Sequence, residues 1–262
     1  MLPSFFSLAD CWYTGNDMSD YTIDLPRISE VKRKAHQGDA GIWRKEFTRQ
    51  YRQILERIFE EIRAETRHVY SSSEEGITCR KGCVTCCAQF VSVPVSHALL
   101  ITDYLYASDK AMSTFLRGYE KWLCGFEASP QAYGVLDILE EYTSRSAAVQ
   151  PYSQDLLSEY HALAISCPFL DKRECAIYPV RPVCCAAYFS VSSPEYCQSD
   201  SATPATILEV KPSEANLRKM VELADPRLYM HQENLPKLVY KLLTSGLPEL
   251  SLEIQRLFDA QG

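Results

Sequence analysis

The segment CRKGCVTCC, residues 79–87, contains four cysteines, and thiolates are ligands both for zinc and for iron–sulfur clusters. Cys83 and Cys86 are separated by two residues, a spacing at which the intervening turn lets both sulfurs reach one metal. Gly82 precedes the pair, and glycine readily adopts the left-handed backbone conformation that such a turn often needs. Because the turn provides only two of the four ligands that these centres usually take, the other ligands must come from elsewhere.

A second group of cysteines begins about 80 positions after the first. We expect the two groups to meet in space and to hold metal jointly. Nine cysteines could fill two four-ligand sites with one left over, or one cluster with several spare, and the sequence leaves both arrangements open. The first group is Cys79, Cys83, Cys86 and Cys87, and the second is Cys167, Cys175, Cys184, Cys185 and Cys197.

Each group contains a cysteine doublet, Cys86-Cys87 and Cys184-Cys185. Neighbouring residues in an extended chain point to opposite sides. The doublets therefore predict that one thiol faces one centre while its neighbour serves a second centre or a structural contact. The two cysteines outside the groups are Cys11 and Cys124. We expect Cys124 to pack in a helical core, and we favour a partly buried thiol over a lipid anchor for Cys11, which follows Asp10.

The composition favours a globular protein in a reducing compartment. The chain has 262 residues, of which 46% are hydrophobic and 23% charged, and its formal net charge is −7. This charge argues against general nucleic-acid binding and suits a lysine-bearing protein or peptide as partner. No apolar run approaches the ~18 residues of a membrane span, and the N-terminus lacks the features of a signal peptide. We therefore expect a cytoplasmic location, where clustered thiols indicate metal in preference to disulfides or merely buried cysteines.

The pattern around the cysteines is mainly helical. Apolar residues at three- and four-residue steps predict a long helix from about 41 to 69. A short extended piece at 90–93 ends at Pro94, and Ser96 is expected to cap the next helix. The expected fold class is mainly α, with an irregular cysteine-rich metal-binding core and at most a short hairpin. The further helices are expected at about 97–108, 109–127, 131–148, 153–165, 213–224 (with Ser213 as its start signal), 235–244 and 248–259.

These elements predict an N-terminal arm and one helical domain. The arm covers residues 1–40 and the domain 41–262. Within the domain, the cysteine-cluster core (79–197) is flanked by the N-terminal helix 41–70 and the C-terminal helices 213–262. The sequence leaves the oligomeric state open.

Three stretches together resemble the cysteine-cluster proteins called the CxxCxxCC or YkgJ-type zinc- or iron-chelating domain. They are CRKGCVTCCAQFVSV (79–93), CPFLDKRECAIYPVRPVCCAAYFS (167–190) and the following Cys197. The family pattern continues after its doublet with Cys-Pro-hydrophobic-Leu, then a cysteine with Ile-Tyr and Arg-Pro ahead of another cysteine, and then a last cysteine. The resemblance implies these metal ligands: Cys83, Cys86, Cys87, Cys167, Cys175, Cys184 and Cys197.

Two positions depart from the family pattern. Three residues separate Cys79 from Cys83, where the family name implies two, and Cys185 stands where a basic residue is expected after Cys184. Cys79 is included among the expected ligands, and Cys185 is left open. The excess of cysteines over four, together with nearby aromatic residues, favours a [4Fe–4S] cluster over zinc.

The same family includes flagellin lysine N-methylases, so the resemblance also implies an alternative activity, protein lysine methylation with S-adenosylmethionine. The chain has no G-x-G loop, so a donor pocket would need another construction. The spacing Cys79-x3-Cys83-x2-Cys86 also matches a radical S-adenosylmethionine cluster. That match is set aside, because Thr85 replaces the usual aromatic residue and the strand–helix alternation of that barrel is missing.

Three residues near the cysteines have simpler structural interpretations. His97 could contact the first cysteine group, but we expect an ordinary residue at a helix N-terminus. Tyr178 and Arg181 could bind a substrate, but we expect them to fix the cysteine-bearing loop.

Overall fold

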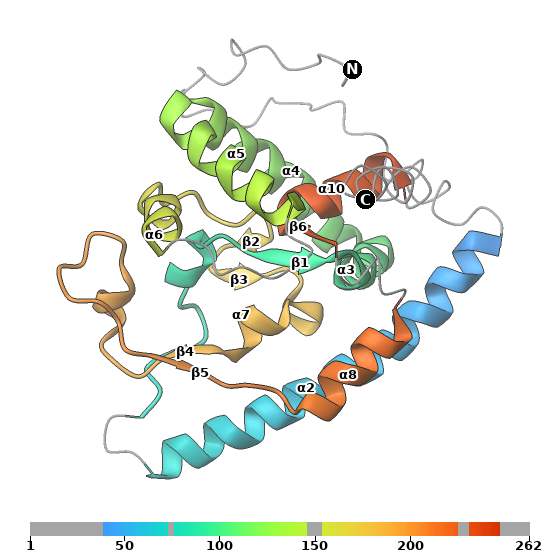
Figure 1. Cartoon of the computed structure of the whole chain (residues 1–262), viewed down its shortest axis with the longest axis horizontal. Coiled ribbons are helices and arrows are strands. Elements are labelled where there is room, and N and C mark those ends of the chain that lie inside the picture. The colour runs from blue at the N-terminus through green and yellow to red at the C-terminus, as the bar shows by residue number, and fades with distance from the viewer. Residues whose placement is uncertain (1–38, 73–75, 146–153, 225–230, 247–262) are drawn as a thin grey trace.

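The computed structural model of the chain describes residues 39–72, 76–145, 154–224 and 231–246 (Figure 1). Cys11 and the expected helix at 248–259 lie outside these residues, as does nearly all of the expected arm. The described helices confirm a mainly α fold around irregular cysteine-rich loops. They are α2 (Asp39–Ser72), α3 (Val95–Ala107), α4 (Asp109–Glu127), α5 (Pro130–Arg145), α6 (Gln154–Ala162), α7 (Val183–Ala187), α8 (Glu214–Leu223) and α10 (Leu235–Thr244).

The long helix α2 runs along one side of the molecule, with α8 lying against it (Figure 1). Its apolar stripe buries Tyr51, Leu55 and Ile58 almost completely. The carboxylate of Glu61 accepts hydrogen bonds from the Ser213 backbone N–H at 3.0 Å and the Ser213 hydroxyl at 2.7 Å. Ser213 also caps α8, as expected, by accepting from the N–H of Asn216. One carboxylate thus joins α2 to the start of α8.

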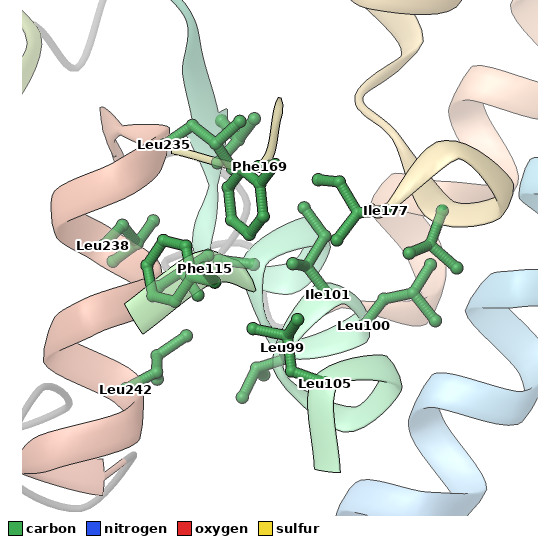
Figure 2. Close-up of a cluster of buried hydrophobic side chains, with 14 of the residues drawn as sticks. Leu99, Leu100, Ile101, Leu105, Phe115, Phe169, Ile177, Leu235, Leu238 and Leu242 are labelled. Atoms are coloured by element: carbon green, nitrogen blue, oxygen red, sulfur yellow. The ribbon is translucent and has the colours of Figure 1, made fainter. Parts of the chain in front are cut away.

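Helices α3, α4 and α10 form the centre of the hydrophobic core. Ten of the 13 residues of α3 are buried, which explains its nearly uniform apolar sequence. Figure 2 shows how residues from α3, such as Ile101, face Phe115 of α4 and Leu238 of α10. The core therefore depends on aliphatic and aromatic burial in helices on both sides of the cysteine-rich sequence.

The expected cap at Ser96 is wrong. Helix α3 begins at Val95, and Pro94 occupies its N-cap position without a side-chain hydrogen bond. Ser96 is buried inside the first turn, and its hydroxyl has no hydrogen-bond partner among the described residues. Tertiary structure sets this boundary, because the Val95 N–H donates to the carbonyl of His231 at 3.3 Å.

Within the described residues, three short antiparallel ladders connect the elements. The expected hairpin is β2 (Leu170–Asp171) with β3 (Glu174–Cys175). Two further ladders join segments more distant in the sequence: β1 (Ser92–Pro94) pairs with β6 (Gln232–Asn234), and β4 (Tyr188–Ser190) pairs with β5 (Ile207–Glu209).

Three 3-10 turns complete the cysteine region: η2 (Thr85–Ala88), η3 (Tyr178–Val180) and η4 (Pro194–Cys197). Among the described residues, no helix combines the length and the apolar character that crossing a membrane requires.

Candidate metal centre

The structure brings the two cysteine groups side by side. The backbone N–H of Cys167 donates to the carbonyl of Cys87 at 2.7 Å, so the two groups share a direct hydrogen bond. The backbone N–H of Ser190, in β4, donates to the Cys79 sulfur at 3.2 Å. Thr78 strengthens this second junction, because its N–H and its hydroxyl both donate to the Ser190 carbonyl. The two cysteine groups, which are separated in the sequence by the helices α3 to α6, therefore meet at the thiols.

The turn before Cys83 has the geometry that its glycine predicts. Gly82 has a φ of +84°, in the left-handed region, and the N–H of Cys83 donates to the carbonyl of Arg80 at 3.0 Å. The turn η2 follows at once and carries Cys86 and Cys87. The first group is thus one continuous tight loop that presents all four of its thiols within a few residues.

The tip of the hairpin β2–β3 contacts this loop through a hydrogen bond and an ion pair. The two turn residues, Lys172 and Arg173, have φ values of +44° and +69°, the conformation that a two-residue type I′ turn requires. The left-handed conformation costs most residues other than glycine about 1–2 kcal/mol each, and Asn and Gly are the usual residues there. The Nε of Arg173 donates to the carbonyl of Gly82 at 2.8 Å, and Lys81 pairs with Glu174 at 3.0 Å. The tip therefore connects the strand that contains Cys175 to the turn before Cys83.

Two contacts anchor the second group to the helical core. The buried ring of Phe169 stacks on Phe115 of α4, with ring centroids 4.5 Å apart (Figure 2). The loop that contains Pro168 approaches α4 at Gly118, where an added Cβ would lie 2.8 Å from the Pro168 Cα. Helix α4 thus needs a glycine at the point where the Cys167 loop crosses it.

His97 contributes a connection that the sequence did not predict. It is buried in the first turn of α3, and its Nε2 lies 3.0 Å from the carbonyl of Val180, which can only accept. Burial lowers the His97 pKa to about 4, so the ring is neutral at pH 7 and donates from Nε2. The imidazole also meets the Tyr51 ring edge-on at 5.7 Å. His97 therefore fixes the turn η3, between Cys175 and Cys184, to the core.

The expectation for the doublets rested on an extended chain and is corrected by the structure. Cys86 and Cys87 lie in the turn η2, and Cys184 and Cys185 lie in the helix α7. The thiols of each doublet are close enough to hydrogen-bond with each other. The doublets thus present adjacent sulfurs instead of thiols on opposite sides of the chain.

The electrostatic neighbours of each thiol describe the arrangement of the cluster. Cys79 interacts with Cys83, Cys86 and Cys197. Cys87 interacts with Cys86, Cys167 and Cys175. Cys86 belongs to both sets, so it lies where the two sets of thiols meet.

Cys185 interacts with Cys86 of the first group and with Cys167 of its own group. The neighbours of Cys184 include Cys185 and Glu209. The family resemblance implies Cys184 as a ligand, and the structure also places Cys185 near thiols of both groups. Residue type and spacing do not distinguish the two positions, because both residues belong to the same doublet.

Burial disfavours ionisation of several of the thiols. Burial raises the pKa of Cys79 and of Cys175, and it raises the pKa of Cys167 to about 12. Within the first doublet, the hydrogen bond from Cys87 lowers the pKa of Cys86, and the same contact raises the pKa of Cys87. Since neighbouring thiolates repel each other, a bound cation is the group that would allow several of them to ionise together.

Arg181 contacts two aromatic rings, one of them that of Tyr178, while its buried Nε has no hydrogen-bond partner among the described residues. The guanidinium of Arg181 lies 3.8 Å from the centroid of the Tyr178 ring and 5.8 Å from that of Phe59 on α2. Its positive charge favours the thiolate of Cys86, and at Cys175 it partly opposes the burial that raises the pKa of that thiol. The arginine therefore adds positive charge beside both cysteine groups.

The side chains do not converge on a metal position as they stand. Among the described residues, no three His, Cys, Asp or Glu side chains are arranged to hold one ion. The ten described cysteines form no disulfide with one another, and Cys86, Cys184 and Cys185 are exposed. The donor set is composed of soft thiols, which suits zinc and iron–sulfur clusters.

The fold and the site together define a mainly helical protein in which two cysteine groups lie side by side. Residues 78–204 match the family model CxxCxxCC, described as "Putative zinc- or iron-chelating domain". This match covers all nine cysteines of the two groups and agrees with the resemblance that the cysteine motifs imply. No curated protein and no solved structure matched the chain in the same comparisons.

Proposed function

We propose that the protein binds a [4Fe–4S] cluster, with zinc as the alternative, through thiols contributed jointly by the two cysteine groups. The observation that carries this proposal is the direct hydrogen bond between Cys167 and Cys87, which holds the groups together. The match to the family model supports metal binding by residues 78–204. The preference for an iron–sulfur cluster over zinc rests on the apolar and aromatic residues near the thiols, such as Phe90 and Phe189, because both kinds of centre usually take four thiolates.

The neighbouring thiols suggest which residues would hold the metal. One set is Cys79, Cys83, Cys86 and Cys197, and the other is Cys86, Cys87, Cys167, Cys175 and Cys185. An iron–sulfur cluster would supply one-electron redox chemistry, and zinc would supply structural cross-linking. In either case the chain orients the thiols through β4, the hairpin tip and the stacked Phe169. We place the protein in the cytoplasm, where these thiols would stay reduced.

Anaerobic purification with metal analysis and an absorption spectrum tests the proposal. A broad visible band that bleaches on reduction, with iron and sulfide in the protein, is the expected result. Cys83→Ser and Cys175→Ser, one from each group, should each lose most of the metal. Cys124→Ser is the matched control on α4, outside both groups, and should keep it.

Two outcomes would contradict the proposal. Full metal occupancy in either Cys83→Ser or Cys175→Ser would contradict a shared site. Purified protein that contains zinc and no iron would contradict the cluster and favour the zinc alternative. Comparing Cys185→Ser with Cys184→Ser sharpens the ligand set, since the first should lose more metal.

Lysine methylation with S-adenosylmethionine remains a second hypothesis, on the resemblance to flagellin lysine N-methylases. A cavity of about 190 Å³ adjoins Cys83, beside the cysteine core where a donor pocket would be expected. Pockets for drug-sized ligands usually enclose about 300–1,000 Å³, so this cavity is small for the whole donor. Calorimetry with S-adenosylmethionine and metal-loaded protein tests the hypothesis, and no detectable binding at millimolar donor would remove it.

A further inference from the structure

The cavity beside Cys83 is built by the same three segments that assemble the thiols. Its wall includes Arg80 and Thr85 from the first cysteine loop, Arg173 from the hairpin tip, and Glu195 and Gln198 at the turn η4. These segments are far apart in the sequence, so the cavity exists only when the cysteine region is folded. Its volume of about 190 Å³ exceeds the ~30 Å³ that one water occupies and is sufficient for a small ligand.

Two arginines give this cavity a positive charge in a chain whose formal net charge is −7. Neither Arg80 nor Arg173 forms an ion pair within the described residues, whereas the neighbouring Lys81 and Glu174 neutralise each other. Glu195 also lines the cavity, so two guanidinium groups face one carboxylate.

The position of Arg173 is unusual for an arginine that merely faces water. It occupies a left-handed turn position, with a φ of +69°, which L-residues rarely adopt. Its Nε is held by the carbonyl of Gly82, while its two Nη groups have no hydrogen-bond partner in the part of the chain that the structure describes. The guanidinium is thus oriented by one hydrogen bond and keeps free donors at the cavity wall.

We propose that this cavity binds a small anion, a carboxylate or phosphate group, between Arg80 and Arg173. Guanidinium groups match both kinds of oxyanion through paired, charge-assisted hydrogen bonds. The ligand would lie against Cys83, at the edge of the thiol cluster. The anion site does not depend on which metal the thiols hold, so it goes beyond the proposed function.

Titration calorimetry with inorganic phosphate and, separately, with acetate tests the site at constant ionic strength in sodium chloride. The metal-loaded protein should bind at least one of them saturably, with one anion per chain. Arg80→Gln should weaken binding about tenfold or more, because a charge-assisted partner is lost. Glu195→Gln should tighten binding severalfold, because a like charge is removed, and a folding defect would not produce such a gain.

Arg57→Gln is the matched control, since Arg57 is an exposed arginine on α2 that does not line the cavity. The affinity of Arg57→Gln for each anion should equal that of the wild-type protein. Saturable binding of phosphate alone identifies a phosphate group as the ligand, and binding of acetate identifies a carboxylate. Unsaturable heats with both anions, or an equal loss in Arg57→Gln, would overturn the site. Metal content is measured in every variant, so a metal-free protein that still binds the anion would separate this inference from the proposed function.

Discussion

The helical core and the cysteine-rich loops are stabilised in different ways. In α3, ten of 13 residues are buried, whereas in the loops from 167 to 197 only eight of 31 are buried. Burial of apolar surface contributes about 25 cal/mol per Å², so the core can be stable on its own side chains. The loops depend instead on hydrogen bonds between distant backbone groups, on a few anchors such as Phe169, and on the metal that we propose.

The two regions should therefore respond to different perturbations. The core should be sensitive to packing, and the loops should be sensitive to the metal. The contacts at His97 and at Gly118 lie where the two regions meet, so they should affect both.

Metal removal should give the largest effect. A ligand present at 1,000 times its Kd stabilises the state that binds it by about 4 kcal/mol. After chelation, the N–H groups of Cys167 and Ala176 should exchange with solvent about 1,000-fold faster, while those in the middle of α3 change far less. Hydrogen exchange followed by mass spectrometry measures both regions in one sample. Unchanged protection of the loops after verified metal loss would contradict the comparison.

Acidification should weaken the junction at His97. The buried ring has a pKa of about 4, against 6.5 in the unfolded chain, so the unfolded chain binds more protons between these values. The contribution is fully present above pH 6.5 and is lost progressively toward pH 4, by about 3 kcal/mol in total. Urea unfolding at pH 7 and at pH 4.5 measures it. His97→Gln should be less stable at pH 7 but should lose less on acidification, and an equal loss in both proteins would refute the assignment.

The close approach at Gly118 should be the next most sensitive point. In Gly118→Ala the new methyl group would overlap the backbone of Pro168, and overpacking of this kind costs about 2 kcal/mol. Gly134→Ala is the matched control on α5, because its new methyl group would meet nothing within 4 Å. The control should gain up to about 1 kcal/mol from helix propensity. Thermal unfolding compares the two variants, and a neutral Gly118→Ala would show that the loop can shift away.

The smallest effect is expected at the hairpin tip. Asn tolerates the left-handed conformation that Lys172 adopts, so Lys172→Asn should stabilise the protein by about 0.5–1 kcal/mol. Lys172→Ala removes the same amine without favouring the turn and should give no such gain. Chemical denaturation distinguishes the two. Equal stabilities would mean that the turn is not strained in solution.

The helices were predictable because their apolar residues repeat at helical spacing, and the expected helix at 109–127 coincides with α4. The start of α3 was not predictable from Ser96, since the ladder of β1 with β6 and the bond from Val95 to His231 fix it. Local preference for a serine cap gave way to pairing with a distant segment.

The kind of ligand atom, a thiol sulfur, and the turn at Gly82 were also predictable, because ligand chemistry and glycine geometry are local properties. The side-chain directions of the doublets were not, because they depend on whether the chain is extended or helical at those residues. The sequence did not predict that His97 holds the turn η3, since only the fold shows that the Val180 carbonyl lies within hydrogen-bond distance of its Nε2. The ligand set itself stays a prediction.

The ladder of β1 with β6 also affects the order of events during synthesis. Ser92 pairs with Asn234, so this ladder cannot close until about 140 further residues have been made. At about 5–20 residues per second, the first cysteine loop waits roughly 7–30 seconds on the ribosome before its surroundings are complete. During that interval its thiols are open to oxidants and to the wrong ions. Chains stalled before residue 232 should therefore be alkylated at Cys83 more readily than released, metal-loaded chains.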